Sequence, residues 1–363
     1  MKLRLRFSQA ALTALFLAAS VGASASQLTN SAFSESVLTV IAGWADGPRR
    51  DRHMPMLADF YQVPSNGPVW VTDGRANAKA RELVEVLSRA DRDALNPADY
   101  RAELLASQLN ATGPNELAYL EVSLSAALLN YTRHLGAGRV RPQRIDTELA
   151  IEPVAPEPLN VLAGAKSTDN IKDFVAGFEP QTPRYLRLRE ALQRFRSLAA
   201  DGGWPRFGSG PVLKPGMPAP ERSEALRQRL MISGDLAPGS HTGTVYDGSL
   251  VKAVERFQAR HGLEVDGVIG ENTLTELNTS ARQRVQQIEL NMERRRWMED
   301  DLGQFFVFDQ ADLLHVGLEH FADFCDERRH ETTAFLEVAS LRIKDLLQLF
   351  CQEDRVATLA EHR

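Results

Sequence analysis

The sequence predicts a mainly α protein with two helical units and a short helical C-terminal tail. Apolar residues recur at three-and-four spacing in several stretches, which indicates helices that each bury one face. A Gly/Pro-rich stretch, Asp201 to Pro211, divides these helices into two groups. With 363 residues the chain exceeds one ordinary domain, so we expect at least two folded units.

Residues 1–25 have the three parts of a secretory signal peptide. A basic start is followed by an apolar stretch at residues 10–21 and by the small-residue cleavage site Ala23-Ser24-Ala25. The apolar stretch is well short of the ~20 residues that span a bilayer. We therefore expect cleavage, export to the periplasm or cell envelope, and no membrane span in the mature form.

Loss of this segment leaves 39 basic and 48 acidic residues, a net charge of −9. Nucleic-acid binding requires a basic face that can neutralise phosphates, so the composition argues against a nucleic-acid partner. No metal-ligand spacing, Gly-rich phosphate loop or paired-carboxylate motif stands out. The sequence thus implies neither a metal site nor a cofactor.

The first domain is expected to span residues 26–205 and to be helical. Its longest predicted helix carries an apolar stripe and ends at Gly136 and Gly138; the stripe consists of Leu117, Leu120, Leu124, Leu128, Tyr131 and Leu135. Shorter helices are predicted around residues 83–87 and, after a proline, around residues 183–195.

The second domain, residues 212–279, is predicted to be a small three-helix bundle. Leu226 and Leu230 mark its first helix, and Asp247 is suited to cap the second. The second helix should end at Gly262 in a left-handed conformation, and Asp266-Gly267 should form a tight turn. Buried positions are expected at Leu250, Ala253, Val254, Phe257, Leu274 and Leu277.

One continuous pattern in this domain resembles the peptidoglycan-binding domain attached to bacterial cell-wall enzymes. It runs Phe257-Gln258-x-x-His261-Gly262-Leu263-x-x-Asp266-Gly267-x-x-Gly270-x-x-Thr273. Turn glycines and an apolar stripe would occur in any compact helical unit, so the match of the whole pattern carries the resemblance. It implies contact with glycan strands or stem peptides, and our candidate binding residues are Arg256, Gln258, His261 and Asp266.

The first domain resembles the scaffold domain of large periplasmic L,D-transpeptidases. Four motifs occur in the order that these enzymes have: Phe60-Tyr61 with Pro68-Val-Trp70, Asn96-Pro97-x-Asp99-Tyr100, Gly138-Arg139-Val140-x-Pro142 and Pro183-x-Tyr185-x-x-Leu188. Together the two resemblances cover roughly residues 30 to 308.

Residues 280–308 are expected to form a helical linker. Their run Glu293-Arg294-Arg295-Arg296-Trp297, which follows Asn278, resembles the linker that leads from the binding domain into the catalytic domain of those enzymes. Ala281, Val285, Ile288 and Met292 predict one apolar helix face. The run Arg294-Arg295-Arg296 is expected to be a solvated helix end, because charge runs on helices are usually exposed. Contact with an anionic glycan is the alternative for these arginines.

L,D-transpeptidases use a cysteine thiolate to attack a stem tetrapeptide, release D-alanine and pass the acyl group to another stem. The family carries this chemistry on a Ser-His-Gly-Cys motif in a largely β domain. That motif is absent from this sequence, and the resemblance stops near Phe308. We therefore predict no catalytic residues and expect the catalytic domain to be missing or replaced.

The tail, residues 309–363, differs from the rest of the chain. It holds both cysteines and four of the eight histidines, with one glycine and no proline, so it is predicted to be helical. Cys325 beside His320 or His330 lacks the family's spacing, and Cys325 and Cys351 could equally form a disulfide or be incidental thiols.

Four interpretations follow, one of which is an authentic non-catalytic wall-binding protein. A shift of reading frame or gene model near Phe308 would give an exported, peptidoglycan-binding but catalytically incomplete relative of the L,D-transpeptidases. The alternatives are a helical interaction or adaptor protein of the cell envelope with unknown protein partners, and an active cross-linking acyltransferase whose catalytic cysteine lies in the tail.

Overall fold

The computed structural model describes residues 32–45, 52–145, 151–237, 239 and 245–298. These residues are mainly helical, as predicted, and their one regular sheet is a two-stranded hairpin. Contacts divide the chain into two compact units. Unit 1 comprises the chain to Asp91 with Leu95–Arg141 and Glu152–Glu179; unit 2 comprises Arg92–Ala94, Pro142–Ile151 and the chain from Pro180.

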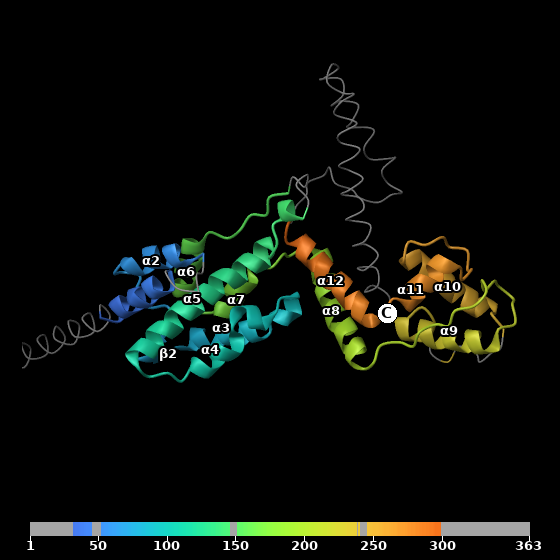
Figure 1. Cartoon of the computed structure of the whole chain (residues 1–363), viewed down its shortest axis with the longest axis horizontal. Coiled ribbons are helices and arrows are strands. Elements are labelled where there is room, and N and C mark those ends of the chain that lie inside the picture. The colour runs from blue at the N-terminus through green and yellow to red at the C-terminus, as the bar shows by residue number, and fades with distance from the viewer. Residues whose placement is uncertain (1–31, 46–51, 146–150, 238, 240–244, 299–363) are drawn as a thin grey trace, which may run out of the picture. The chain divides into compact units, whose positions relative to one another are not determined.

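Unit 1 is a cluster of helices around the long helix α5 (Figure 1). A helix at residues 32–45 is followed by α2 (Met54–Gln62), α3 (Ala78–Ser88), α4 (Ala102–Gln108), α5 (Pro114–Ala137), α6 (Pro158–Ser167) and α7 (Ile171–Ala176). Helices α2, α3, α4 and α6 all contact α5. The predicted stripe of α5, from Leu117 to Leu135, is buried in this core.

Two glycines, Gly136 and Gly138, were predicted to end α5, and only Gly138 does so. Gly138 caps the helix with φ 76°, which a residue without a Cβ adopts easily. Gly136 does not end the helix but belongs to its last turn. Only the residue that reverses the backbone direction needs a positive φ, and Gly136 keeps the helical conformation.

A hairpin that the sequence analysis did not predict joins α2 to α3. Strands β1 (Val71–Thr72) and β2 (Arg75–Ala76) pair antiparallel around Asp73 and Gly74, whose φ angles are 51° and 67°. Two consecutive residues with positive φ are typical of a tight hairpin turn, for which Asp-Gly is a preferred pair. Asn77 then caps α3 by accepting a hydrogen bond from the Ala80 N–H.

Unit 2 contains a helix pair and a three-helix bundle. Helices α8 (Pro183–Ala200) and α12 (Ala281–Arg295) pack side by side (Figure 1). Tyr185, Leu192, Ile288 and Met292 are buried in the core of this pair. The apolar face predicted for α12 is therefore used against α8, a pairing that the sequence analysis did not foresee.

The bundle consists of α9 (Pro220–Ser233), α10 (Gly248–Arg260) and α11 (Glu271–Asn278), as predicted. Asp247 caps α10 by accepting hydrogen bonds from the N–H groups of Ser249 and Leu250, and Gly262 follows the helix with φ 60°. Phe257 is fully buried in the bundle core together with Leu226, Leu230, Leu250, Ala253, Val254 and Leu277.

The expectation of a solvated arginine run at the end of α12 is wrong. Arg295 and Arg296 are buried, with 6% and 1% of their surface exposed. The Arg296 guanidinium donates to the Tyr185 hydroxyl (2.8 Å), the Glu293 carboxylate (3.2 Å) and the Asp93 carbonyl. A charge run on an isolated helix favours water, but here Tyr185 of α8, Glu293 of α12 and the Asp93 carbonyl replace water as hydrogen-bond partners of Arg296.

Several predictions fall outside the described residues. These are the signal peptide at residues 1–25, the end of the linker, and the tail with Cys325 and Cys351. Within the described part of the chain, no helix is both long enough and apolar enough to cross a bilayer.

Candidate functional site

Gln258, a candidate binding residue, is buried at the turn between α10 and α11. Its side-chain carbonyl accepts the N–H groups of Asp266 (3.2 Å) and Gly267 (2.9 Å). Its amide donates to the Asp266 carboxylate (2.8 Å) and the Thr273 hydroxyl (3.2 Å). These hydrogen bonds stabilise the turn and occupy the polar groups of the Gln258 side chain. The Gln258 residue is only 1% exposed.

The turn also explains two further residues of the pattern. Asp266 accepts the Val268 N–H (2.8 Å), an arrangement typical of an Asx turn. Gly267 has φ 67°, and a Cβ there would lie 2.8 Å from the Val251 side chain. Most of the pattern therefore builds the fold, and a ligand contact by Gln258 or Asp266 stays a prediction.

Arg256 lies on α10, and His261 directly follows the last residue of this helix. The Arg256 guanidinium donates two hydrogen bonds, of 3.0 and 2.7 Å, to the Asp235 carbonyl after α9. His261 stacks on Phe257 with 4.1 Å between ring centroids, and its Nδ1 lies 3.5 Å from an Arg284 nitrogen and 3.7 Å from the Glu276 carboxylate. Of the four candidates, His261 alone lines the cavity described below.

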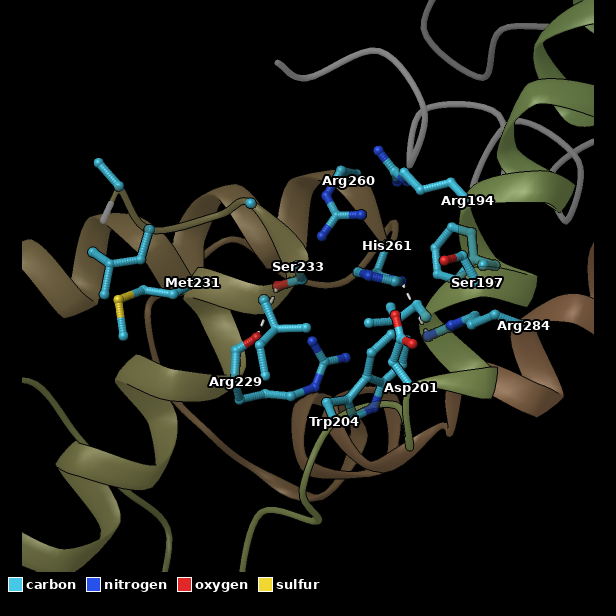
Figure 2. A pocket seen from close by; sticks show the side chains of 16 residues that line it. Arg194, Ser197, Asp201, Trp204, Arg229, Met231, Ser233, Arg260, His261 and Arg284 are labelled. Carbon is cyan, nitrogen blue, oxygen red and sulfur yellow. Dashed lines mark hydrogen bonds between the residues drawn. The ribbon is translucent and has the colours of Figure 1, made fainter. Parts of the chain in front are cut away.

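That cavity, of about 730 Å³, lies within unit 2 between α8, the bundle and the start of α12 (Figure 2). Apolar side chains supply part of its wall; they are Phe195, Leu198, Trp204, Met231, Ile232 and Leu236. Four arginines and one carboxylate supply most of its charge; they are Arg194, Arg229, Arg260, Arg284 and Asp201. In an acidic protein this is a local concentration of positive charge.

Two of these arginines form ion pairs with carboxylates of residues that do not themselves line the cavity. Arg260 forms a two-pronged ion pair with Asp235, with distances of 3.1 and 2.6 Å. Arg284 pairs with Glu276 and also donates to Gln287 at 2.9 Å. Both carboxylates make their ion pairs with arginines other than Arg229, although they also attract Arg229 electrostatically.

Arg229 differs from them because it forms no ion pair with any described residue. Its Nε donates to the Leu277 carbonyl (2.9 Å), and its guanidinium lies over the Trp204 ring, 4.0 Å from the centroid (Figure 2). Its Nη1 is buried and has no hydrogen-bond partner in the described part of the chain. Burial, followed by repulsion from Arg284, lowers the pKa of Arg229 to about 9, so it stays charged at neutral pH.

Trp204, Arg229 and Arg284 were not among the site residues predicted from the sequence. One signal was available for Arg229, which lies three residues after Leu226 and beside Leu230 on the buried stripe of α9. A charged residue at a core-facing position calls for a partner. Trp204 stood in the Gly/Pro-rich stretch, where a large aromatic residue is also unexpected.

A second buried charge lies in unit 1. The Glu121 carboxylate accepts the N–H groups of Val69 (2.6 Å) and Trp70 (3.0 Å) and the Tyr61 hydroxyl (2.8 Å). Burial raises the pKa of Glu121 to about 7 although these hydrogen bonds oppose the shift. Ser125 joins the cluster by accepting the Trp70 indole N–H (2.8 Å). Glu121 thus fastens the start of the hairpin to α5.

Within the described ranges, no group of three His, Cys, Asp or Glu side chains is placed to hold a metal ion. The cavity offers cations, an indole and an imidazole, a set suited to holding an anion. We therefore describe it as a candidate ligand-binding site.

Two segments of the chain match known protein families. Residues 55–192, from α2 into α8, match the family described as "Scaffold domain". Residues 220–277, which are α9 to α11, match the "Putative peptidoglycan binding domain". No curated protein matches the chain. A scaffold domain followed by a peptidoglycan-binding domain defines a cell-wall-associated protein of the cell envelope.

Proposed function

We propose that this protein is an exported cell-wall protein that binds peptidoglycan through the α9–α11 bundle. The match of residues 220–277 to a peptidoglycan-binding domain carries the proposal. The signal-peptide pattern of residues 1–25 supports export to the periplasm, where peptidoglycan is accessible.

Co-sedimentation of the purified chain with purified sacculi tests this proposal. We expect a larger bound fraction than for an unrelated protein of similar size and negative charge. Excess soluble muropeptides should release the bound chain. Sedimentation no greater than that of the acidic control would contradict peptidoglycan binding.

We further propose that the chain resembles murein L,D-transpeptidases but is a catalytically incomplete form. The order of the scaffold and peptidoglycan-binding matches supports the resemblance. The absence of a Ser-His-Gly-Cys sequence supports incompleteness, because a thiolate, a base and an oxyanion site act as a unit.

Incubation with disaccharide tetrapeptides, followed by mass spectrometry of cross-linked dimers, tests this second proposal. We expect no dimers from the purified chain. Dimers that disappear in Cys325→Ala or Cys351→Ala would contradict it and would favour an acyltransferase whose cysteine lies in the tail. Fusion after Phe308 of an alternative-frame domain with Ser-His-Gly-Cys, if the DNA encodes one, should restore activity.

A further inference from the structure

We propose that the cavity beside Trp204 binds a carboxylate of a peptidoglycan stem peptide and that Arg229 is the cation that recognises it. This inference rests on the proposed peptidoglycan binding and names the chemical group and the residues involved. None of the four residues that the sequence pattern suggested would supply this charge.

The first argument is the balance of charge around the cavity. Arg260 and Arg284 are paired with Asp235 and Glu276, and Arg194 and Asp201 bring one charge of each sign to the wall. Among the described residues that line the cavity, this count leaves the charge of Arg229 without a counter-ion. One negative charge on a ligand would therefore balance the site.

The second argument is the hydrogen-bonding state of Arg229. A guanidinium has five N–H donors, and burying one without a partner costs stability. Arg229 is 1% exposed, and its Nη1 makes no hydrogen bond to a described residue. An aromatic face attracts the cation but accepts no conventional hydrogen bond. A carboxylate in the cavity would supply the missing charge.

The third argument is the size and mixed character of the cavity. Its volume of about 730 Å³ falls within the range of roughly 300–1,000 Å³ that is typical of small-molecule sites. Arginines supply polar contacts, and Trp204, Leu198 and Leu236 supply apolar ones. A short peptide with carboxylate groups and methyl side chains, such as a D-alanine stem end, combines both features.

Peptidoglycan has two sources of carboxylate, the stem peptide and the lactyl group of glycan strands that have lost their stems. We assign the stem peptide because apolar side chains line the cavity together with the arginines. The binding experiment therefore compares soluble tetrapeptide, the same peptide with its carboxylates amidated, and stem-free glycan fragments, each titrated into the purified full chain by calorimetry.

The decisive variant is Arg229→Met, which keeps the length and apolar stem of the side chain and removes the charge. We expect tetrapeptide affinity to fall roughly ten- to a hundredfold, the range for hydrogen bonds to a charged group. Amidated peptide should bind the unchanged chain with a similar loss. Stem-free glycan should bind weakly to both proteins.

Arg222→Met is the matched control on the same helix. Arg222 also donates to a backbone carbonyl, that of Pro211 (2.7 Å), and also lies over an aromatic ring, that of Phe207 (5.1 Å), but it does not line the cavity. This variant should keep tetrapeptide affinity. Ser197→Trp is a second test because Ser197 is an exposed cavity residue on α8 and a bulky ring there should block the ligand.

Unchanged tetrapeptide affinity in both Arg229→Met and Ser197→Trp would overturn the assignment of the cavity. Equal binding of amidated and free peptide would overturn the role of the carboxylate. If sacculus binding survives in these variants, peptidoglycan binding stands and only the cavity proposal fails. If the unchanged chain binds neither sacculi nor tetrapeptide, both proposals fail.

Discussion

Glu121 in unit 1 and Arg229 in unit 2 are both buried charges, but their surroundings differ. The Glu121 carboxylate is surrounded by donors from the backbone of Val69 and Trp70 and from Tyr61. The Arg229 guanidinium has one backbone acceptor, an aromatic face and a cavity. Protein groups supply hydrogen-bond donors to the Glu121 carboxylate, whereas Nη1 of Arg229 has no hydrogen-bond partner among the described residues.

This difference separates a structural charge from a candidate binding charge. A buried polar group whose partners all belong to the fold stabilises the arrangement of those partners. A buried cation that keeps an unused donor beside a cavity weakens the free protein and can strengthen a complex. Replacement of Glu121 should therefore affect stability first, and replacement of Arg229 should affect binding first.

The largest effect is expected for Phe257→Ala, which provides an apolar reference next to Arg229. Phe257 is fully buried in the bundle core, and such a truncation typically lowers the free energy of unfolding by ~3–5 kcal/mol. Chemical denaturation measures the loss. Sacculus binding should fall only as far as the bundle unfolds; lost binding at unchanged thermal stability would place Phe257 at the ligand surface.

Glu121→Gln should lower the free energy of unfolding of unit 1 by about 1–3 kcal/mol at neutral pH. The substitution exchanges one acceptor oxygen for an NH₂ donor, which faces the Trp70 N–H if it replaces Oε2 and the Val69 N–H and Tyr61 hydroxyl if it replaces Oε1. Thermal unfolding, with Glu116→Gln on an exposed turn of the same helix as control, measures the effect. Equal stability of the two variants would remove the structural role assigned to Glu121.

The stability of unit 1 should also depend on pH through Glu121. Its folded pKa of about 7 lies above its ordinary value of 4.5, so the folded state binds the proton more tightly. The contribution of Glu121 to stability is then fully present below pH 4.5 and is lost as the pH rises to about 7, by at most ~1.4 kcal/mol per pH unit. Tyr61, Lys79 and Lys166 also interact with this carboxylate.

Denaturant unfolding at several pH values, compared with Glu121→Gln, isolates this contribution. The difference in unfolding free energy between the two proteins should shift across this pH range and level off above it. A difference that stays constant from pH 4.5 to 7 would show that the folded carboxyl titrates normally.

The smallest effect on stability is expected for Arg229→Met. Loss of the Leu277 hydrogen bond and of the contact with Trp204 is offset by removal of a buried, unpaired charge. We expect the free energy of unfolding to change by no more than ~1 kcal/mol. A loss of several kcal/mol in calorimetric unfolding would show that Arg229 is a structural charge like Glu121.

Local signals in the sequence predicted most helices but not the contacts between distant segments. The cap at Asp247, the left-handed Gly262 and the stripe of α10 depend on neighbouring residues, so spacing was sufficient. The Asp73-Gly74 hairpin was also local, and its turn pair could have been recognised. The burial of Arg296 depends on the packing of α12 against α8, which spacing does not reveal.

The cavity could not be predicted from the sequence, because it also depends on contacts between segments that are distant in the chain. Trp204, Arg229 and Arg284 come from a loop and two helices that are far apart in the chain, and the fold brings them to one wall. Two of the candidates taken from the sequence pattern, Gln258 and Asp266, form hydrogen bonds that stabilise a turn. Only His261 lies at the cavity.

The central contrast is tested most directly by measuring sacculus binding and calorimetric unfolding together for the unchanged chain, Glu121→Gln and Arg229→Met. The account predicts that Glu121→Gln loses stability in unit 1 and keeps binding, whereas Arg229→Met keeps its unfolding temperature and loses binding. Full binding by Arg229→Met, or lost binding that accompanies lost stability of unit 2, would contradict the account.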